Sequence, residues 1–257
     1  MANWNAVRDS NLLLASLSRK DGERFIAACE PVDLTFAEIL AEPNELIRYV
    51  YFPTSSFISL VSKIDGHDKL EMGLVGNEGM LGATLILDLP EWPLLGMVQG
   101  AGVALRMATA PFLRELQQTP ELRRVLQRYL FTVIEQVVQT AACAHYHVLE
   151  SRLARCLLMT QDRAHSNQFH VTHEFLAYKL GVRRVGITAA SIALHKRNLI
   201  AYSRGDVTIL DRSGLEAASC ECYKADKATY ARLMSSQYLA PAPDYRTPAL
   251  AACTSAK

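Results

Sequence analysis

The feature that most constrains the fold is a long helical pattern that contains no glycine or proline from residue 121 onward. Apolar or small side chains recur in it every three or four positions: Leu122, Leu126, Tyr129, Val133, Val137, Thr140, Ala144 and Val148. This spacing predicts one long helix, or two helices joined end to end. Pro120 suits the first turn of that helix, and Thr119 is its expected N-cap.

A helix of about 25 residues is about 38 Å long, so its apolar stripe needs a cover along its whole length. That cover is either the chain's own domain or the same helix of a second copy. The length and the mixed spacing favour a homodimer formed through residues 119–146. The expected interface residues are Leu122, Leu126, Tyr129, Val133, Val137 and Thr140.

Residues 31–107 have a different texture, with many glycines and short runs of strand-forming residues. The runs are PVDLTF, LIRYVYF, FISLVSKID, KLEMGLV and VALRM. Asp65 and Gly66, which separate two of these runs, are a β-hairpin signal. The region therefore predicts an antiparallel sandwich or barrel, against which the helical pattern of residues 11–30 is expected to pack.

Residues 172–212 predict a helix-turn-helix followed by a β-hairpin wing. Thr172 is a suitable N-cap for the segment EFLAYKL, and Gly181 permits a sharp turn before RRVGITAASIALHKRN. The runs LIAYSRG and DVTILD then meet at residues 204–206. The start of the second helix is the part that reaches base edges in such a motif. The expected DNA-binding residues are Arg183, Arg184, Val185, Thr188, Lys196 and Arg204.

Local charge supports DNA binding. Residues 171–212 contain seven positive side chains and three negative ones, which gives +4 against +1 for the whole chain. The positive side chains are Lys179, Arg183, Arg184, Lys196, Arg197, Arg204 and Arg212. A solvated basic face is the alternative interpretation of any such cluster, but the helix pair, the turn and the basic hairpin together are more specific.

Composition excludes several classes of protein. The 257 residues are half apolar, with a formal net charge of +1, so a positive field can come only from local clustering. No apolar run is as long as a membrane span, and the N-terminus lacks the basic start and apolar core of a signal peptide. We therefore expect a cytoplasmic protein with no membrane partner. The six cysteines include no Cys-x-x-Cys pair, and reduced thiols are expected.

Candidate metal ligands are too few in each place to complete a site, which needs three or four. Cys143 and His147 are four residues apart and share a helical face, with no third ligand on that face. Cys220 and Cys222 are too close to share a helical face, and although a loop could bring them together, no neighbouring residue completes a site. We expect no metal and no cofactor.

Catalytic patterns are likewise missing from the sequence. His67, Asp68 and Glu71 resemble part of a cupin metal site but lack its second histidine. There is no nucleophile–base motif and no phosphate-binding loop. We therefore expect that the protein is not an enzyme. The alternative function is a small-molecule-binding or cupin-like jelly roll whose helical C-terminal part is only a scaffold.

A β-rich region, a long helix and a winged helix-turn-helix, in this order, resemble the Crp/Fnr family of bacterial transcription regulators. The resemblance covers roughly residues 20–215 and is strongest in EFLAYKLGVRRVGITAASIALHKRNLI and YSRGDVTIL; VYFPTSSFISLV and SRLARCLL add weaker support. It implies an α+β fold with a jelly-roll sensor domain, a homodimer and a palindromic operator. By position, Arg184 matches the family's guanine-reading arginine, whereas Val185 and Ala189 replace a base-reading glutamate and a second arginine.

The resemblance also sets expectations for the sensor. Members that bind cyclic nucleotides hold the ribose with a glutamate and the phosphate with an arginine. The matching stretch, GMLGATLILDLPEWPLLGMVQ, has Ala83 at the acidic position and no basic residue. We therefore expect that cyclic AMP does not bind in the usual way. The candidate pocket residues are Gly79, Gly82, Ala83 and Leu95, and an iron–sulfur cluster is excluded because the first hundred residues hold only Cys29.

The expected domain order has four parts. Residues 1–118 form the jelly-roll sensor, residues 119–148 the dimerisation helix, residues 149–238 the winged helix-turn-helix and residues 239–257 a disordered tail. The expected partners are double-stranded DNA and a second copy of the chain, with RNA polymerase as a further candidate. The sequence does not identify a small-molecule effector.

Overall fold

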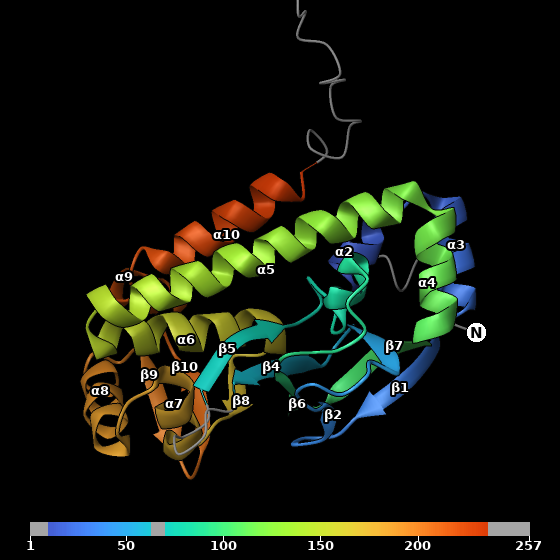
Figure 1. The fold of residues 1–257 in the computed structure, drawn as a ribbon. Coiled ribbons are helices and arrows are strands. Elements are labelled where there is room, and N and C mark those ends of the chain that lie inside the picture. The colour runs from blue at the N-terminus through green and yellow to red at the C-terminus, as the bar shows by residue number, and fades with distance from the viewer. Residues whose placement is uncertain (1–9, 63–69, 236–257) are drawn as a thin grey trace, which may run out of the picture.

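Two antiparallel sheets form the N-terminal part of the chain (Figure 1). The computed structural model describes residues 10–62 and 70–235. One sheet has the order β1-β7-β3, from β1 (Glu30–Leu34), β7 (Gly102–Ala108) and β3 (Tyr49–Pro53). The other has the order β2-β6-β4-β5, from β2 (Ile39–Ala41), β6 (Leu95–Gly100), β4 (Phe57–Ser62) and β5 (Leu70–Val75). The expected antiparallel β domain of an α+β fold is confirmed.

Two of these strands, β2 and β6, were not expected from the sequence. β6 contains Gly96 and Gly100, and glycine is depleted in strands. Gly100 pairs with Phe57 across the sheet, and a side chain at Gly100 would overlap the Phe57 ring. This glycine is therefore explained by close packing. The Asp65-Gly66 hairpin signal lies outside the described residues.

Three helices close one end of the sheets: α2 (Leu12–Ala15), α3 (Arg19–Ala27) and α4 (Thr109–Gln118). The helical pattern of residues 11–30 is divided because Ser18 starts a new helix, where its side chain accepts a hydrogen bond from the backbone of Asp21. Phe25 of α3 packs edge to face on Phe52 of β3, with 5.3 Å between ring centroids. These helices and α5 enclose the larger apolar core of the N-terminal part.

The long helix predicted from residue 121 is present as α5 (Pro120–Tyr146). Pro120 occupies its first turn, as expected, but the Thr119 side chain caps no backbone group of α5. It accepts a hydrogen bond from the Arg24 guanidinium instead. One face of α5 lies on the sheets, where the short 3₁₀-helix η1 (Ala83–Leu87) also packs. Tyr129 fills the space left by Gly79 and donates a hydrogen bond to the Met80 carbonyl.

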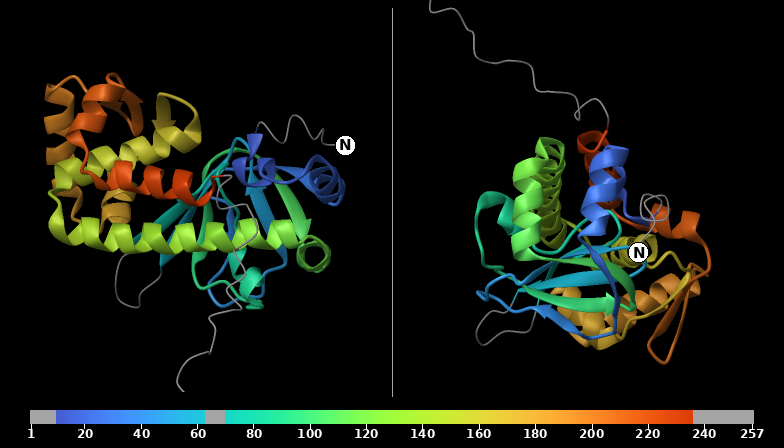
Figure 2. Two further views of the ribbon diagram at one scale, coloured as in Figure 1. Left: turned by 90° about the horizontal axis from the view of Figure 1, so that it is seen from above. Right: turned by 90° about the vertical axis from the view of Figure 1, so that its right-hand side faces the viewer.

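The C-terminal part contains a second core. Its elements are α6 (Leu149–Ala164), β8 (Gln168–His170), α7 (His173–Leu180), α8 (Arg184–Lys196), β9 (Ile200–Ser203), β10 (Asp206–Ile209), α9 (Arg212–Ala218) and α10 (Cys222–Leu233). The strand order is β8-β10-β9. The last helix, α10, returns alongside α5, as Figures 1 and 2 show, and so connects this part to the N-terminal one.

Buried polar contacts hold the two parts together. Lys179 of α7 forms an ion pair of 2.8 Å with Glu71 of β5, and both side chains are buried. The Arg163 guanidinium lies 2.6 Å from the Glu78 carboxylate, while the Tyr230 hydroxyl donates to the Glu78 carbonyl at 2.8 Å. The position of the C-terminal part is thus fixed by interactions between specific residues. In the part of the chain that the structure describes, no helix combines the length and the apolarity needed to span a membrane.

Candidate DNA-binding surface

Helices α7 and α8 meet at a tight turn that the local sequence specifies. The Thr172 hydroxyl accepts a hydrogen bond of 3.1 Å from the Phe175 backbone and so caps α7, as expected. Gly181 ends α7 with a φ of 63°, in the left-handed region that favours glycine. The Val182 backbone then donates to the Ala177 carbonyl at 3.0 Å, which fastens the turn to the end of α7. The predicted helix-turn-helix therefore forms around the expected glycine.

The outer face of α8 is presented to solvent. Its inner face carries Ile187 and Leu194, which are buried in the core of the C-terminal part. Outward residues follow at helical spacing: Val185, Ala189, Ile192 and Lys196. Val185 is 73% exposed. Arg183 is the N-cap of α8 and Arg184 its first residue, and both are exposed. The two arginines thus project from the end of α8 expected to enter a groove.

Thr188 is less available than the sequence suggests. Its hydroxyl lies 3.1 Å from Nδ1 of His173 and also donates to the Arg184 carbonyl at 3.2 Å. The His173 ring stacks on Tyr202 of β9, with ring centroids 4.1 Å apart. Burial, assisted by the nearby Arg184 charge, lowers the pKa of His173, so this imidazole is favoured in its neutral form. His173 and Tyr202 connect α7, α8 and the hairpin. No sequence pattern indicates this role, because it depends on contacts between separate elements.

The wing is a hairpin of β9 and β10, with Arg204 and Gly205 at its tip. Both residues have positive φ, 52° and 93°, which is the geometry of the two-residue turns that suit hairpins. The Arg204 side chain is exposed. Next to the tip, the Asp206 carboxylate lies within hydrogen-bonding distance, at 2.9 Å, of Nδ1 of His170 in β8. The expected wing is present, with a basic residue at its tip.

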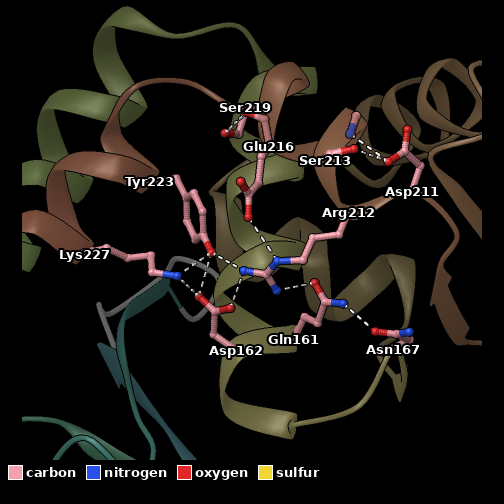
Figure 3. Close-up of polar contacts among 11 residues, drawn as sticks. Gln161, Asp162, Asn167, Asp211, Arg212, Ser213, Glu216, Ser219, Tyr223 and Lys227 are labelled. Atoms are coloured by element: carbon pink, nitrogen blue, oxygen red, sulfur yellow. Dashed lines mark hydrogen bonds and ion pairs between the residues drawn. The ribbon is translucent and has the colours of Figure 1, made fainter.

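Three of the seven positive side chains counted in the sequence form ion pairs with acidic side chains of the same chain. Lys179 pairs with Glu71, and Arg197 pairs with Glu150 at 2.8 Å. Arg212 joins Asp162 at 2.7 Å and Glu216 at 3.0 Å, in the network shown in Figure 3. The other four are exposed and form no ion pair with any residue of 10–62 or 70–235: Arg183, Arg184, Lys196 and Arg204. Within residues 171–212, the unpaired positive charge therefore lies on α8 and the wing.

The expected dimer-interface residues do not lie on the exposed face of α5. Leu122, Leu126 and Tyr129 are buried in the core of their own protomer, so the expectation that they face a partner is wrong. Val133 and Val137 line a cavity between α5 and β5, and Thr140 accepts a hydrogen bond of 3.3 Å from Arg155. The opposite face of α5 is the exposed one. Its outward residues are Gln127, Phe131, Ile134, Val138, Ala141 and His145.

The four candidate pocket residues do not converge on one cavity. Gly79 packs on Tyr129, while Ala83 and Leu95 are buried in packed regions. Gly82 lines a cavity of about 120 Å³ next to Trp92. The cavity between α5 and β5 measures about 170 Å³ and has an almost wholly apolar lining. Pockets that hold small molecules are usually about 300–1,000 Å³, so neither space has the size of a ligand site.

Comparison with known proteins supports the assignment of a helix-turn-helix to the C-terminal part. Residues 151–218 match the family model described as a Crp-like helix-turn-helix domain. No curated protein matches the chain. Among solved structures, FixK2 from Bradyrhizobium japonicum has 12% identity and a TM-score of 0.64, over 75% of this chain and 98% of that one. A Crp/Fnr-family regulator from Eubacterium rectale has 16% identity and a TM-score of 0.64, over 82% of this chain and 98% of that one.

A third structure, the c-di-GMP responsive global regulator CLP of Xanthomonas campestris, has 16% identity and a TM-score of 0.61, over 75% of this chain and 99% of that one. At these identities the likeness is one of fold. The match over residues 151–218 adds the helix-turn-helix domain itself. The chain therefore carries a Crp-like helix-turn-helix domain, on a fold that it shares with a solved regulator of the Crp/Fnr family.

Proposed function

We propose that the protein is a homodimer that binds a palindromic operator through α8 and the wing. The observation that carries the proposal is the exposed, unpaired group of Arg183, Arg184 and Lys196 on α8, next to Arg204 at the hairpin tip. Phosphates attract such a group, and side chains at the start of the helix read bases. Because the proposed target is DNA, we also propose a cytoplasmic location. Contact with RNA polymerase stays a prediction.

Base reading would come mainly from Arg184, which can donate two hydrogen bonds to a guanine. Val185 and Ala189 are exposed and apolar, so they suit contacts with thymine methyl groups. Arg204 at the wing tip would contact phosphate, which positions the protein without reading sequence. This division of roles predicts different consequences for substitutions at the two arginines.

The exposed face of α5 is the proposed dimer interface. Its outward positions 127, 131, 134, 138, 141 and 145 alternate steps of four and three residues, which is the spacing of a two-stranded coiled coil. Phe131, Ile134 and Val138 supply the apolar side chains. A second α5 packed here would relate the two copies of α8 by a two-fold axis, and a palindromic operator has the matching symmetry.

The DNA test begins with selection of bound sequences from a random pool by the full-length protein. Arg184→Ala should weaken binding to the selected site by about 1–3 kcal/mol and relax the preference at one base pair per half-site. Arg204→Ala should weaken binding to selected and unrelated DNA alike. Arg114→Ala, at an exposed arginine on α4, is the matched control and should bind as the wild type does. Sequence-independent losses of equal size for both test variants would contradict base reading by Arg184.

We also propose that the sensor part binds no cyclic nucleotide in the family's usual way. Ala83 stands at the acidic position, residues 81–105 hold no cation, and the cavity lined by Val133 and Val137 is small and apolar. A ligand at 100 times its dissociation constant would stabilise the folded protein by about 2.7 kcal/mol. Thermal melting with millimolar cyclic AMP or cyclic GMP should therefore show no shift. A clear rise in melting temperature with cyclic AMP or cyclic GMP would overturn this assignment.

A further inference from the structure

Four potential metal ligands converge where α5 ends. Cys143 lies in the last turn of α5 and His147 directly follows that helix. Cys220 and Cys222 lie at the junction of α9 and α10. Each of the four side chains offers one donor atom, and all four donors lie within 4.8 Å of one another. The three cysteines are buried, and they form a small cluster that includes no other apolar side chain.

The spacing of the donors fits tetrahedral coordination. Metal–sulfur bonds of 2.3 Å and metal–nitrogen bonds of 2.0–2.1 Å would separate two sulfurs by about 3.8 Å, and a sulfur from a nitrogen by about 3.6 Å. In the structure, Sγ of Cys143 lies 3.5 Å from Sγ of Cys220. Sγ of Cys222 lies 3.5 Å from Nδ1 of His147. Small shifts of these side chains would therefore complete the coordination shell.

The surroundings of the cluster resemble those of a metal centre. His147 presents Nδ1 to the sulfurs while its Nε2 lies 3.0 Å from the Glu221 carboxylate, an outer contact that commonly orients ligating histidines. Gln139 donates a hydrogen bond of 2.9 Å to Sγ of Cys222, which favours the thiolate form. Three thiolates and a divalent ion carry a net charge of −1. The Arg155 guanidinium, which pairs with Asp226, is also close enough to interact electrostatically with Cys143 and Cys222.

We propose that Cys143, His147, Cys220 and Cys222 form a tetrahedral site for Zn²⁺ or a similar thiophilic divalent metal. Sulfur and imidazole ligands in this geometry select such ions. Binding would release the thiol protons to solvent, so the affinity should fall as the pH falls. The His147 side chain is 23% exposed, which gives the ion an entry path. A bound metal would fix the start of α10 to the end of α5, next to the link that leads into the DNA-binding domain.

The first measurement is the metal content of full-length protein purified in reducing buffer and supplied with Zn²⁺. We expect one equivalent per chain. Replacement by Co²⁺ should give thiolate-to-metal charge-transfer absorption and the visible bands of a tetrahedral centre. His147→Gln should lower the Zn²⁺ affinity at least 10-fold, and Glu221→Gln should lower it about 10–100-fold. The neighbouring His145 is exposed and not part of the cluster, so His145→Gln is the matched control.

Cysteine variants test the sulfur ligands separately. Cys143→Ser and Cys222→Ser should each reduce the charge-transfer absorption, whereas Cys29→Ser, in the N-terminal part, should leave it unchanged. Circular dichroism identifies any variant that fails to fold, and His147→Gln and Glu221→Gln leave all three thiols in place.

Substoichiometric zinc with no cobalt charge-transfer band would overturn the proposal. So would equal affinities for His145→Gln and His147→Gln, or a Cys143–Cys220 disulfide present in place of metal. Because these measurements involve no DNA, their outcome is independent of the proposed operator binding.

Discussion

Replacing Ile134 and Val138 with glutamate should convert the proposed dimer into monomers. Both side chains lie on the outward face of α5, where they are 52% and 61% exposed in the protomer. Because neither belongs to a core of its own protomer, their replacement should leave the fold intact. The same change at Val133 and Val137 would instead place charge in the apolar cavity between α5 and β5.

The size of the effect follows from the exposed fractions. Fully burying an aliphatic side chain of this kind contributes about 1.5–3 kcal/mol, so burying the exposed half contributes about 1 kcal/mol. Two positions in each of two protomers give about 4 kcal/mol, which raises the dissociation constant of the dimer about 1,000-fold. Charge repulsion between the introduced glutamates adds to this loss.

Sedimentation velocity over a range of protein concentrations measures the change directly. The wild type should sediment as a dimer, and the Ile134→Glu, Val138→Glu double variant as a monomer with the same circular dichroism spectrum. Leu89→Glu is a suitable control because Leu89 is also about half exposed, at 53%, and does not belong to α5. A double variant that remains dimeric at the concentrations where the wild type does would show that the interface lies elsewhere.

Two further predictions concern stability. Arg155 and Asp226 form a buried ion pair of 2.6 Å, and Arg155→Met should lower the free energy of unfolding by about 3–5 kcal/mol because it leaves a buried carboxylate unpaired. Burial raises the pKa of Asp226 even with Arg155 beside it, so adding Asp226→Leu should restore most of the loss in denaturant titrations; no recovery would contradict the desolvation argument. Burial alone would raise the pKa of Asp162, but hydrogen bonds from Tyr223 and Arg212 outweigh it and hold that pKa below the ordinary 3.8. The unfolding free energy should therefore fall as the pH drops below 3.8, and Asp162→Asn should flatten that dependence; an unchanged pH profile would refute it.

The winged helix-turn-helix was predictable because its signals are local. The Thr172 cap, the left-handed Gly181 and the Arg204-Gly205 turn each act within a few residues of the chain. They specify helix boundaries and a hairpin whatever the rest of the protein does. The existence of α5 followed in the same way, from a long stretch without glycine or proline. The positive charges could also be counted from the sequence. Whether each one is free to contact DNA could not be predicted, since the partners of Lys179 and Arg212 come from other elements.

The role of each face of α5 was decided only by the tertiary structure. Apolar side chains occur on two sides of this helix, at Leu122 and Leu126 and again at Ile134 and Val138. A repeat of three and four residues fits both faces, so periodicity predicts the helix and cannot say which face its own domain covers. The sheets and α10 cover the first face and leave the second exposed.

The cysteine–histidine cluster shows the same limit more strongly. Cys143 and His147 were recognisable as a pair on one helical face, but Cys220 lies 77 residues from Cys143. The return of α10 along α5 brings Cys220 and Cys222 to Cys143 and His147. The turn at Glu221 lets Cys220 and Cys222 face the same side. Sequence patterns report local geometry, whereas a site made from two distant segments depends on how the folded chain packs.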